Sequence, residues 1–407
     1  MDYSSISKEL THKLSKIIKK NNGIYFTPPS CVMKNLELLK PFINSKDEMN
    51  VLEPSCGSGE YVTVIHTLYP HLNITAIEYN ETIYNSISHL ADDNLHIHNM
   101  DFLKYDTDKK YDLIIGNPPY YVMKKNEVEK GYYIYFEGRP NIFILFLIKS
   151  LQLLTDNGIL SFVLPKNFLN CLYYDKTRKY IDKYFKILYI IDCNEDKYLE
   201  TQQETIVLII QKRGEGKKLV NAEYILNNNN YTIFATKENI HSFKKLYEQS
   251  CSLHELGFKV SVGTVVWNQC KDILTDDDSK TRLIYSSDIV NNKLTMKKYA
   301  NSEKKNFINK SGINRPMIVI NRGYGVGDYH FQYCLLDEME KEYLIENHLI
   351  CIECVKSLTH LEMIEEYKKI ISSLNDTRTC EFIDVYFGNN AINTTELNNI
   401  LPIYQDI

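Results

Sequence analysis

The feature that most constrains the fold of this chain is a series of short apolar segments, separated by stretches long enough to form helices. Nearly continuous apolar segments of this length are typical of strands buried on both faces of a parallel sheet. Between two of them, Pro140–Leu154 has the proline start and wide apolar face of a crossover helix. Strands that alternate with helices predict an α/β, doubly wound, Rossmann-like domain. The expected strands are 49–53, 73–78, 95–99, 111–116, 158–164, 186–192 and 204–211.

This alternation ends near Arg213 and divides the chain into two expected domains. Polar residues that break regular structure follow in 214–218 and 227–230. We expect domains at 1–230 and 231–407, and 407 residues are ample for two cores. The pattern of the second region predicts a mixed α+β domain. Its expected elements are strands at 260–267, 283–285 and 317–320, and a helix at 359–374 with Thr359 as its N-cap.

The distribution of charge and the length of the apolar runs limit the classes of function that the chain can have. The net charge is −5, but residues 201–330 hold 19 basic and 13 acidic residues, a net charge of +6. A basic segment is a modest indication of a polyanionic partner. The longest apolar run, 142–148, is far shorter than the about 18 residues that a membrane span needs. Residues 1–20 lack the apolar core of a signal peptide, and the ten cysteines are scattered. We therefore expect a cytoplasmic protein without a membrane partner.

A glycine-rich turn, Glu-Pro-Ser-Cys-Gly-Ser-Gly, follows the first expected strand. Gly57 and Gly59 allow the backbone to approach a ligand closely, and nucleotide-like ligands bind at this turn in a doubly wound sheet. Glu78 ends the second expected strand, where an acidic side chain can accept the hydroxyl groups of a ribose. Asp101 follows the third, where it can accept an adenine amine while Phe102 lies on the ring. These residues suit a nicotinamide cofactor or any other adenosine-bearing cofactor.

The motif with the most specific chemistry is Asn117-Pro118-Pro119-Tyr120, which follows the fourth expected strand. Two prolines end the strand abruptly and fix the backbone, so that the Asn117 amide and the Pro118 carbonyl point the same way. Both oxygens can accept hydrogen bonds from a planar amino group, which frees the nitrogen lone pair for in-line attack on an electrophilic methyl. Tyr120 offers a face for stacking on the ring that bears the amine. The motif predicts amine methylation by orientation and electrostatics, without a metal.

The order of these motifs resembles that of gamma-class, site-specific DNA (adenine-N6) methyltransferases of type II restriction–modification systems, which use S-adenosylmethionine. As in that family, a Tyr-Phe-Thr-Pro-Pro segment at 25–29 precedes the glycine-rich turn, and 162–169 and 394–403 match later motifs. Cys56 departs from the small Ala or Gly that is common there, but it is small enough to fit. The resemblance implies cofactor contacts from Thr27, Glu53, Cys56, Gly57, Glu78, Asp101 and Phe102. It implies catalytic roles for Asn117, Pro118 and Tyr120, and substrate binding by Pro119 and Phe168.

The resemblance also assigns S-adenosylmethionine binding and catalysis to 1–230 and DNA target recognition to 231–407. An adenine inside a duplex must be flipped out, so it needs a pocket wall opposite Tyr120. We expect that wall in 121–139 or around 201–205. The first segment, rich in Tyr and Lys, is either a mobile loop that folds over the substrate or only a solvated insertion. The candidates for reading double-stranded DNA are Trp267, Arg282, Arg315, Arg322 and the glycine-rich loop 323–327.

Three other functions remain open. An enzyme with the same motif can methylate a glutamine amide of a release factor or a guanine of ribosomal RNA. The glutamine enzymes, however, carry their substrate domain ahead of the glycine-rich turn, whereas here the extra residues follow it. A nicotinamide oxidoreductase explains Gly57 and Glu78 but leaves Asn117 without a purpose. A catalytically inactive DNA-binding subunit conflicts with the intact motif. For a site-specific DNA methyltransferase, we expect a monomer that protects DNA from a cognate restriction enzyme acting separately.

Overall fold

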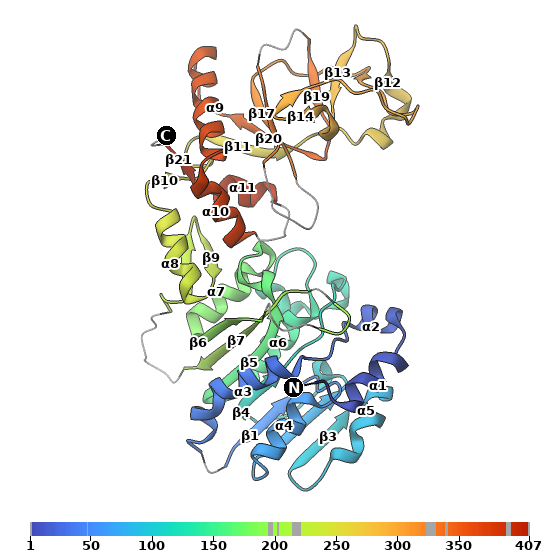
Figure 1. Ribbon diagram of the computed structural model, residues 1–407, viewed down its shortest axis with the longest axis vertical. Helices are drawn as coiled ribbons and strands as arrows, with labels where there is room; N and C mark the ends of the chain where they lie inside the picture. Colours follow the sequence, from blue (N-terminus) through green and yellow to red (C-terminus); the bar gives the residue numbers. More distant parts are fainter. Residues whose placement is uncertain are drawn as a thin grey trace. The chain divides into compact units, whose positions relative to one another are not determined.

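The computed structural model describes residues 2–46, 48–193, 198–201, 203–213, 221–322, 331–337, 341–387 and 392–405. The chain forms two compact units, Met1–Ile240 and His241–Ile407 (Figure 1). The division lies at 240, whereas the sequence pattern placed it at 230. The glycine-rich loop 323–327 lies outside the described residues. In the part of the chain that is described, no helix combines the length and apolar character that crossing a membrane requires.

The first unit is built on a seven-stranded sheet with the order β3-β2-β1-β4-β5-β7-β6. Strands β1 to β5 pair in parallel, as predicted, whereas β7 runs antiparallel to both β5 and β6. The apolar pattern did not reveal this reversal, because a strand buried on both faces looks the same in either direction. Each expected strand is present: β1 (Asn50–Glu53), β2 (Asn73–Glu78), β3 (Leu95–Asn99), β4 (Tyr111–Gly116), β5 (Leu154–Pro165), β6 (Phe185–Asp192) and β7 (Thr205–Lys212).

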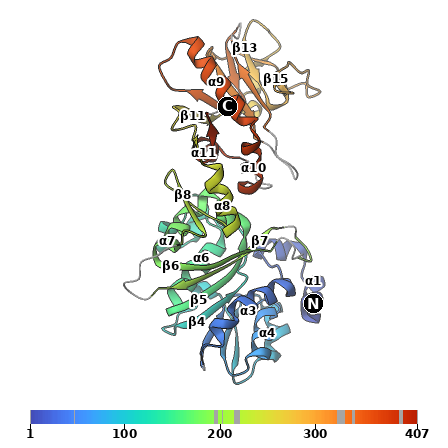
Figure 2. The same cartoon turned by 60° about the vertical axis from the view of Figure 1, so that its left-hand side comes forward.

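Helices cover both faces of this sheet, which confirms the doubly wound α/β fold (Figure 2). Side chains alternate between the two faces along each strand: Phe162 and Leu164 pack with α6 and α7, whereas Val163 packs with α3 and α4. The hairpin of β8 (Ile225–Asn228) and β9 (Tyr231–Phe234) follows the sheet strands. The helices are α1 (Ser5–Lys13), α2 (Lys16–Asn22), α3 (Pro29–Ile43), α4 (Glu60–Leu68), α5 (Glu81–Ile87), α6 (Ile142–Leu153), α7 (Asp175–Tyr184) and α8 (Lys237–Leu246).

The order of the strands reverses between β1 and β4, and this is where the polar motifs gather. Parallel strands end at the same edge of a sheet, and a ligand binds in the crevice outside those ends, at the point of reversal. The glycine-rich turn leaves β1 with Gly57 at φ +53° and Gly59 at φ +81°, in the left-handed region that favours glycine. The Asn-Pro-Pro-Tyr motif leaves β4 beside it.

The second unit contains two four-stranded sheets, β11-β20-β17-β18 and β12-β16-β13-β19, as the α+β pattern predicted. The expected helix at 359–374 is α9, and the Thr359 hydroxyl accepts from the Glu362 amide as its N-cap. The strand expected at 260–267 ends at Val262. Gly263 follows it, at a position where a Cβ would lie 2.2 Å from the Glu346 carbonyl oxygen. The elements are β10 (Ser250–Cys251), β11 (Phe258–Val262), β12 (Leu274–Thr275), β13 (Thr281–Ile284), β14 (Ile289–Val290), β15 (Lys293–Leu294), β16 (Phe307–Ile308), β17 (Met317–Asn321), β18 (Tyr333–Leu336), β19 (Tyr343–Ile345), β20 (Leu349–Cys354), α9 (His360–Leu374), α10 (Thr377–Tyr386), α11 (Thr394–Asn399) and β21 (Ile403–Tyr404).

Candidate functional site

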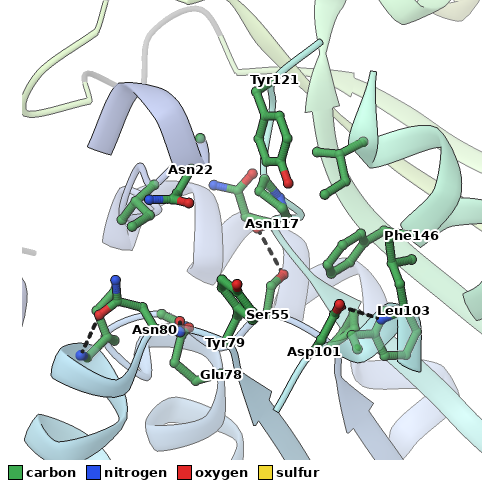
Figure 3. Close-up of a pocket in the computed structure, with 18 of the residues that line it drawn as sticks. Asn22, Ser55, Glu78, Tyr79, Asn80, Asp101, Leu103, Asn117, Tyr121 and Phe146 are labelled. Carbon is green, nitrogen blue, oxygen red and sulfur yellow. Dashed lines mark hydrogen bonds between the residues drawn. The ribbon is translucent and has the colours of Figure 1, made fainter. Parts of the chain in front are cut away.

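A cavity of about 250 Å³ lies at the carboxyl edge of the sheet in the first unit. Its walls come from the ends of β1, β2, β3 and β4 and from the chain that follows α2, and Figure 3 shows the side chains that surround it. The motifs predicted several ligand-binding residues that are distant in the sequence. These residues therefore meet around one cavity. The predicted residues that line this cavity are Gly57, Glu78, Asp101, Phe102, Asn117 and Pro119.

The Glu78 carboxylate already holds part of the cavity wall in place. One oxygen accepts the Gly57 amide at 2.9 Å, and the other accepts the Asn80 amide at 2.7 Å. Glu78 is only 7% exposed, and its burial raises the pKa of the side chain to about 7. Because a carboxylate has about four lone-pair sites, Glu78 can fix the glycine-rich turn and still accept from a bound hydroxyl group. Asp101, in comparison, caps the short helical turn after β3 by accepting the Leu103 amide at 2.9 Å.

A small neighbouring cavity of about 30 Å³, which shares Gly57 and Asn117 with the lining of the first, lies beside the glycine-rich turn. Thr27, Glu53 and Cys56 line it, and all three are almost fully buried. One Glu53 oxygen, Oε2, is buried without a hydrogen-bond partner among the described residues, and burial raises the pKa of this carboxyl well above its ordinary value. A buried acceptor of this kind suits a cationic donor on a ligand. Gly57 lies opposite the Phe26 ring, at the junction with the larger cavity.

The Asn117 side chain is oriented by contacts on both of its ends. Its Nδ2 donates to the Tyr25 carbonyl at 3.2 Å, and its Oδ1 accepts from the Tyr120 hydroxyl. The Ser55 hydroxyl lies 3.3 Å from the Asn117 backbone carbonyl (Figure 3). The Tyr120 hydroxyl also lies 2.8 Å from the Val163 carbonyl, and burial raises its pKa well above the ordinary value. Asn117 is therefore held in one orientation, with a lone pair on Oδ1 left for a second donor.

A second cavity, of about 120 Å³, lies on the Tyr120 side of this turn. Its wall includes Thr201 and Thr205, which lie in the segment expected to face Tyr120. Tyr25 and Tyr198 complete the aromatic lining. Sequence reasoning missed both as lining residues, because a tyrosine in a loop carries no spacing signal. The motif thus stands between two cavities, one lined by the cofactor candidates and one rich in tyrosine.

The insertion 121–139 is a folded part of the first unit. Val122 pairs with Asn141 in an antiparallel bridge, and the 3-10 helix Lys130–Tyr135 lies within the insertion. Val128 and Phe136 are 7% and 3% exposed and belong to the core beneath α6. Most of the other side chains of 121–139 are exposed, so the insertion is largely solvated and buries apolar surface at these two positions.

The other predicted residues are Phe168 and Pro118 in the first unit and three arginines in the second. Phe168 is fully buried and packs against Phe143, Tyr174 and Phe234, so any effect on substrate binding is indirect. In the second unit, the Arg282 guanidinium donates to the Thr295 carbonyl at 2.7 Å, and Arg315 forms an ion pair with Glu353. Arg322 directly follows β17, at the opposite end of that strand from Arg315. The three arginines therefore do not form one cluster. Pro118, the remaining predicted catalytic residue, is buried within the turn.

Comparison with known proteins finds similarity to DNA-modification enzymes of one kind. Residues 2–199 match the model of the Eco57I restriction-modification methylase family. The chain is 28% identical to the type II methyltransferase M.CvrRI of Paramecium bursaria Chlorella virus XZ-6E, over 98% of both chains. It is 32% identical to the modification methylase CviBIII of Paramecium bursaria Chlorella virus NC1A, over 44% of this chain and 47% of that protein. With M.AccI of Acinetobacter calcoaceticus, a type II methyltransferase, it shares 30% identity over 48% of this chain and 38% of that one.

A solved structure, the cryo-EM structure of a DrdV–DNA complex, matches 98% of this chain and 57% of that chain with a TM-score of 0.54. At 13% identity this likeness concerns the fold. The sheet topology is the Rossmann-like fold found in S-adenosylmethionine-dependent methyltransferases, and the family match and the relatives support S-adenosylmethionine as the cofactor. More particularly, the family match and the relatives confirm the predicted resemblance to type II methyltransferases of restriction–modification systems.

Proposed function

We propose that the chain transfers a methyl group from S-adenosylmethionine to the N6 amino group of an adenine that is flipped out of a short double-stranded DNA site. The observation that carries this proposal is the position of the Asn-Pro-Pro-Tyr turn between two cavities. One cavity has the acidic and aromatic residues that suit an adenosine-bearing ligand. The other has the tyrosines that suit a planar base.

The residues of the first cavity and of the small cavity beside it fit the successive parts of the cofactor. Glu53, with its orphaned buried oxygen, suits the ammonium group of the methionine part. Glu78 suits the ribose hydroxyls, and Asp101 with Phe102 suits the adenine. When bound, S-adenosylmethionine supplies a methyl group on a positively charged sulfur, which makes the carbon electrophilic.

The residues of the chain orient the target amine and localise the lone pair on its nitrogen. Asn117 Oδ1 and the Pro118 carbonyl accept the two N–H groups of the target amine, which localises the nitrogen lone pair. The Tyr25 and Tyr120 contacts hold the Asn117 amide in place, so little reorganisation is needed when the base arrives. The cofactor held by Glu53, Glu78 and Asp101 would supply the methyl group to the amine nitrogen and would be left as a neutral thioether, and the extra amine proton would leave to water.

We further propose that 231–407 recognises the DNA target, while 1–230 binds the cofactor and performs the reaction. Within this domain, residues 231–330 hold 15 basic and 10 acidic residues, a net charge of +5, which supports DNA as the partner. A type II methyltransferase of this kind would act as a monomer in the cytoplasm and protect DNA from a separate, cognate restriction enzyme. Glutamine amides and ribosomal RNA guanine remain the alternative substrates with the same amine chemistry, and an inactive DNA-binding subunit remains the alternative without it.

The decisive experiment is methyl transfer from labelled S-adenosylmethionine to unmethylated genomic DNA, followed by sequencing that identifies modified adenines. We expect label at N6 of adenine within one short motif. Asn117→Ala should abolish transfer and leave DNA binding intact, because it removes an acceptor for the amine without removing any charge. Label in protein or RNA of a cell extract, with none in DNA, would support the alternative substrates instead.

A further inference from the structure

The amino-terminal part of the chain has an unusual charge pattern that the motif analysis did not use. Residues 10–36 contain lysines at 13, 16, 19, 20 and 34 and no acidic residue. The overall composition has more acidic than basic residues. A stretch with only positive charge therefore stands out locally, and it includes α2 and the chain that leads into the cofactor cavity.

Helix α2 shows most of its surface to solvent. Lys16 and Lys20 are four residues apart, so they lie on the same face, and both are exposed. Neither takes part in an ion pair with any described residue. Ile17 and Ile18 are 72% and 42% exposed on the same short helix. Two exposed isoleucines next to two free positive charges form a surface that suits a partner with phosphate and apolar parts.

Among the described residues of α2, the only buried side chain is also a lysine, and it ties the helix to the second cavity. Lys19 is 4% exposed, and its Nζ donates to the Thr11 carbonyl at 2.7 Å and to Glu200 at 2.6 Å. Glu200 lies between Tyr198 and Thr201, which line the cavity on the Tyr120 side. The surface of α2 is thus fixed relative to the proposed base pocket.

The other end of α2 rests on the catalytic turn. Gly23 caps the helix at φ +62°, and a Cβ there would lie 2.5 Å from the Tyr120 nitrogen. Two residues later, the Tyr25 carbonyl accepts the Asn117 amide. Through Gly23 the helix therefore contacts Tyr120, which lines the second cavity, and through Lys19 it contacts Glu200, the neighbour of Thr201 in the wall of that cavity.

We propose that α2 is a docking surface for the DNA backbone beside the flipped nucleotide. In this proposal, which rests on the proposed function, Lys16 and Lys20 bind phosphates and Ile17 packs against the adjoining deoxyribose. The charge complementarity is direct: the helix offers free ammonium groups, and double-stranded DNA carries a negative charge per about 1.7 Å of its axis. Binding at this surface does not depend on the DNA sequence, because phosphates carry no sequence information.

The test measures the salt dependence of binding to a duplex that contains the site found by sequencing. Each phosphate contact contributes about 0.9 to the slope of log affinity against log salt concentration. For the double variant Lys16→Gln, Lys20→Gln, we expect the slope to become shallower by about 2. The affinity at 0.1 M salt should fall roughly 10- to 60-fold, and the charge reversal to glutamate should weaken binding further.

A matched control removes the same charge elsewhere on the first unit. Lys40 lies near the end of α3 and Lys186 at the start of β6, both exposed and both at the sheet edge opposite the carboxyl ends of the parallel strands. The double variant Lys40→Gln, Lys186→Gln should keep the wild-type slope within about 0.5. Affinity for S-adenosylmethionine should be unchanged in both variants, since neither pair lines the cofactor cavity.

The outcomes separate this proposal from the proposed function. If the wild type methylates DNA and both double variants show the same slope, α2 does not bind the backbone and the inference is overturned. The inference also fails if the α2 variant loses activity only in a cell extract with other proteins present, because that result would indicate a protein partner for α2. If the wild type neither binds nor methylates DNA, the proposed function itself fails.

Discussion

Replacing Gly23 by alanine tests whether the contact of α2 with the Asn-Pro-Pro-Tyr turn supports stability and the proposed catalysis. The substitution places a Cβ 2.5 Å from the Tyr120 nitrogen and 3.0 Å from its carbonyl carbon and oxygen. The left-handed backbone, at φ +62°, costs a non-glycine residue about 1–2 kcal/mol. Relief of the overlap requires backbone movement, which costs about 1–3 kcal/mol more. Gly23→Ala should therefore destabilise the first unit by about 2–5 kcal/mol.

Alanine substitutions at two other glycines distinguish the cost of a left-handed backbone from the cost of a steric overlap of the new Cβ. Gly57 is also left-handed, at φ +53°, but its Cβ would meet only the Phe26 ring at 3.7 Å, an ordinary contact. Gly57→Ala should therefore cost only about 1–2 kcal/mol of stability and raise KM for the cofactor. A Cβ on Gly131 would meet nothing within 4 Å, so Gly131→Ala should stay within about 0.5 kcal/mol of the wild type.

The assays are urea unfolding and steady-state methylation with each variant. A shift of about 1 Å in the Tyr120 backbone would misplace the Asn117 acceptor, so Gly23→Ala should lower kcat about 100-fold. KM for the cofactor should rise less in Gly23→Ala than in Gly57→Ala. If Gly23→Ala matches Gly131→Ala in both stability and kcat, the close contact between α2 and Tyr120 does not support catalysis, and the reasoning is refuted.

Two further predictions concern Glu78 and Phe168. Burial raises the pKa of Glu78 to about 7. Because ribose hydroxyls donate better to the ionised carboxylate, the affinity for the cofactor should rise as the pH increases from 6 to 8. The rise should be at most about tenfold per pH unit below pH 7. Calorimetry should show this trend, and Glu78→Gln should abolish the part of it that this carboxyl causes; a flat wild-type profile would contradict the assignment. Phe168→Ala should lower stability by about 3–5 kcal/mol, because it empties a core position. If the variant instead has normal stability but a raised KM for DNA, the result would support the predicted role of Phe168 in substrate binding.

The sequence determined the layout of the first unit and which polar residues meet at the edge of its sheet. Apolar segments such as 73–78 and 111–116 become sheet strands because their burial on both faces leaves a continuous hydrophobic signal. Polar residues that follow such strands, as Glu78 and Asn117 do, meet at one edge because parallel strands end together. These inferences need only local pattern and the geometry of a parallel sheet, and this is why they could be made without coordinates.

Only the tertiary structure decided which distant segments touch the site. No local pattern signals that Gly23 rests on Tyr120, that Lys19 reaches Glu200, or that Tyr198 completes a cavity. The direction of β7 was equally hidden, since a strand buried on both faces reads the same either way. Arg315, a candidate base reader in the sequence, has Glu353 as its partner in the fold. The physical reason is common to all of them: contacts between residues far apart in the chain depend on how elements pack, and a sequence pattern records only how each element buries its own faces.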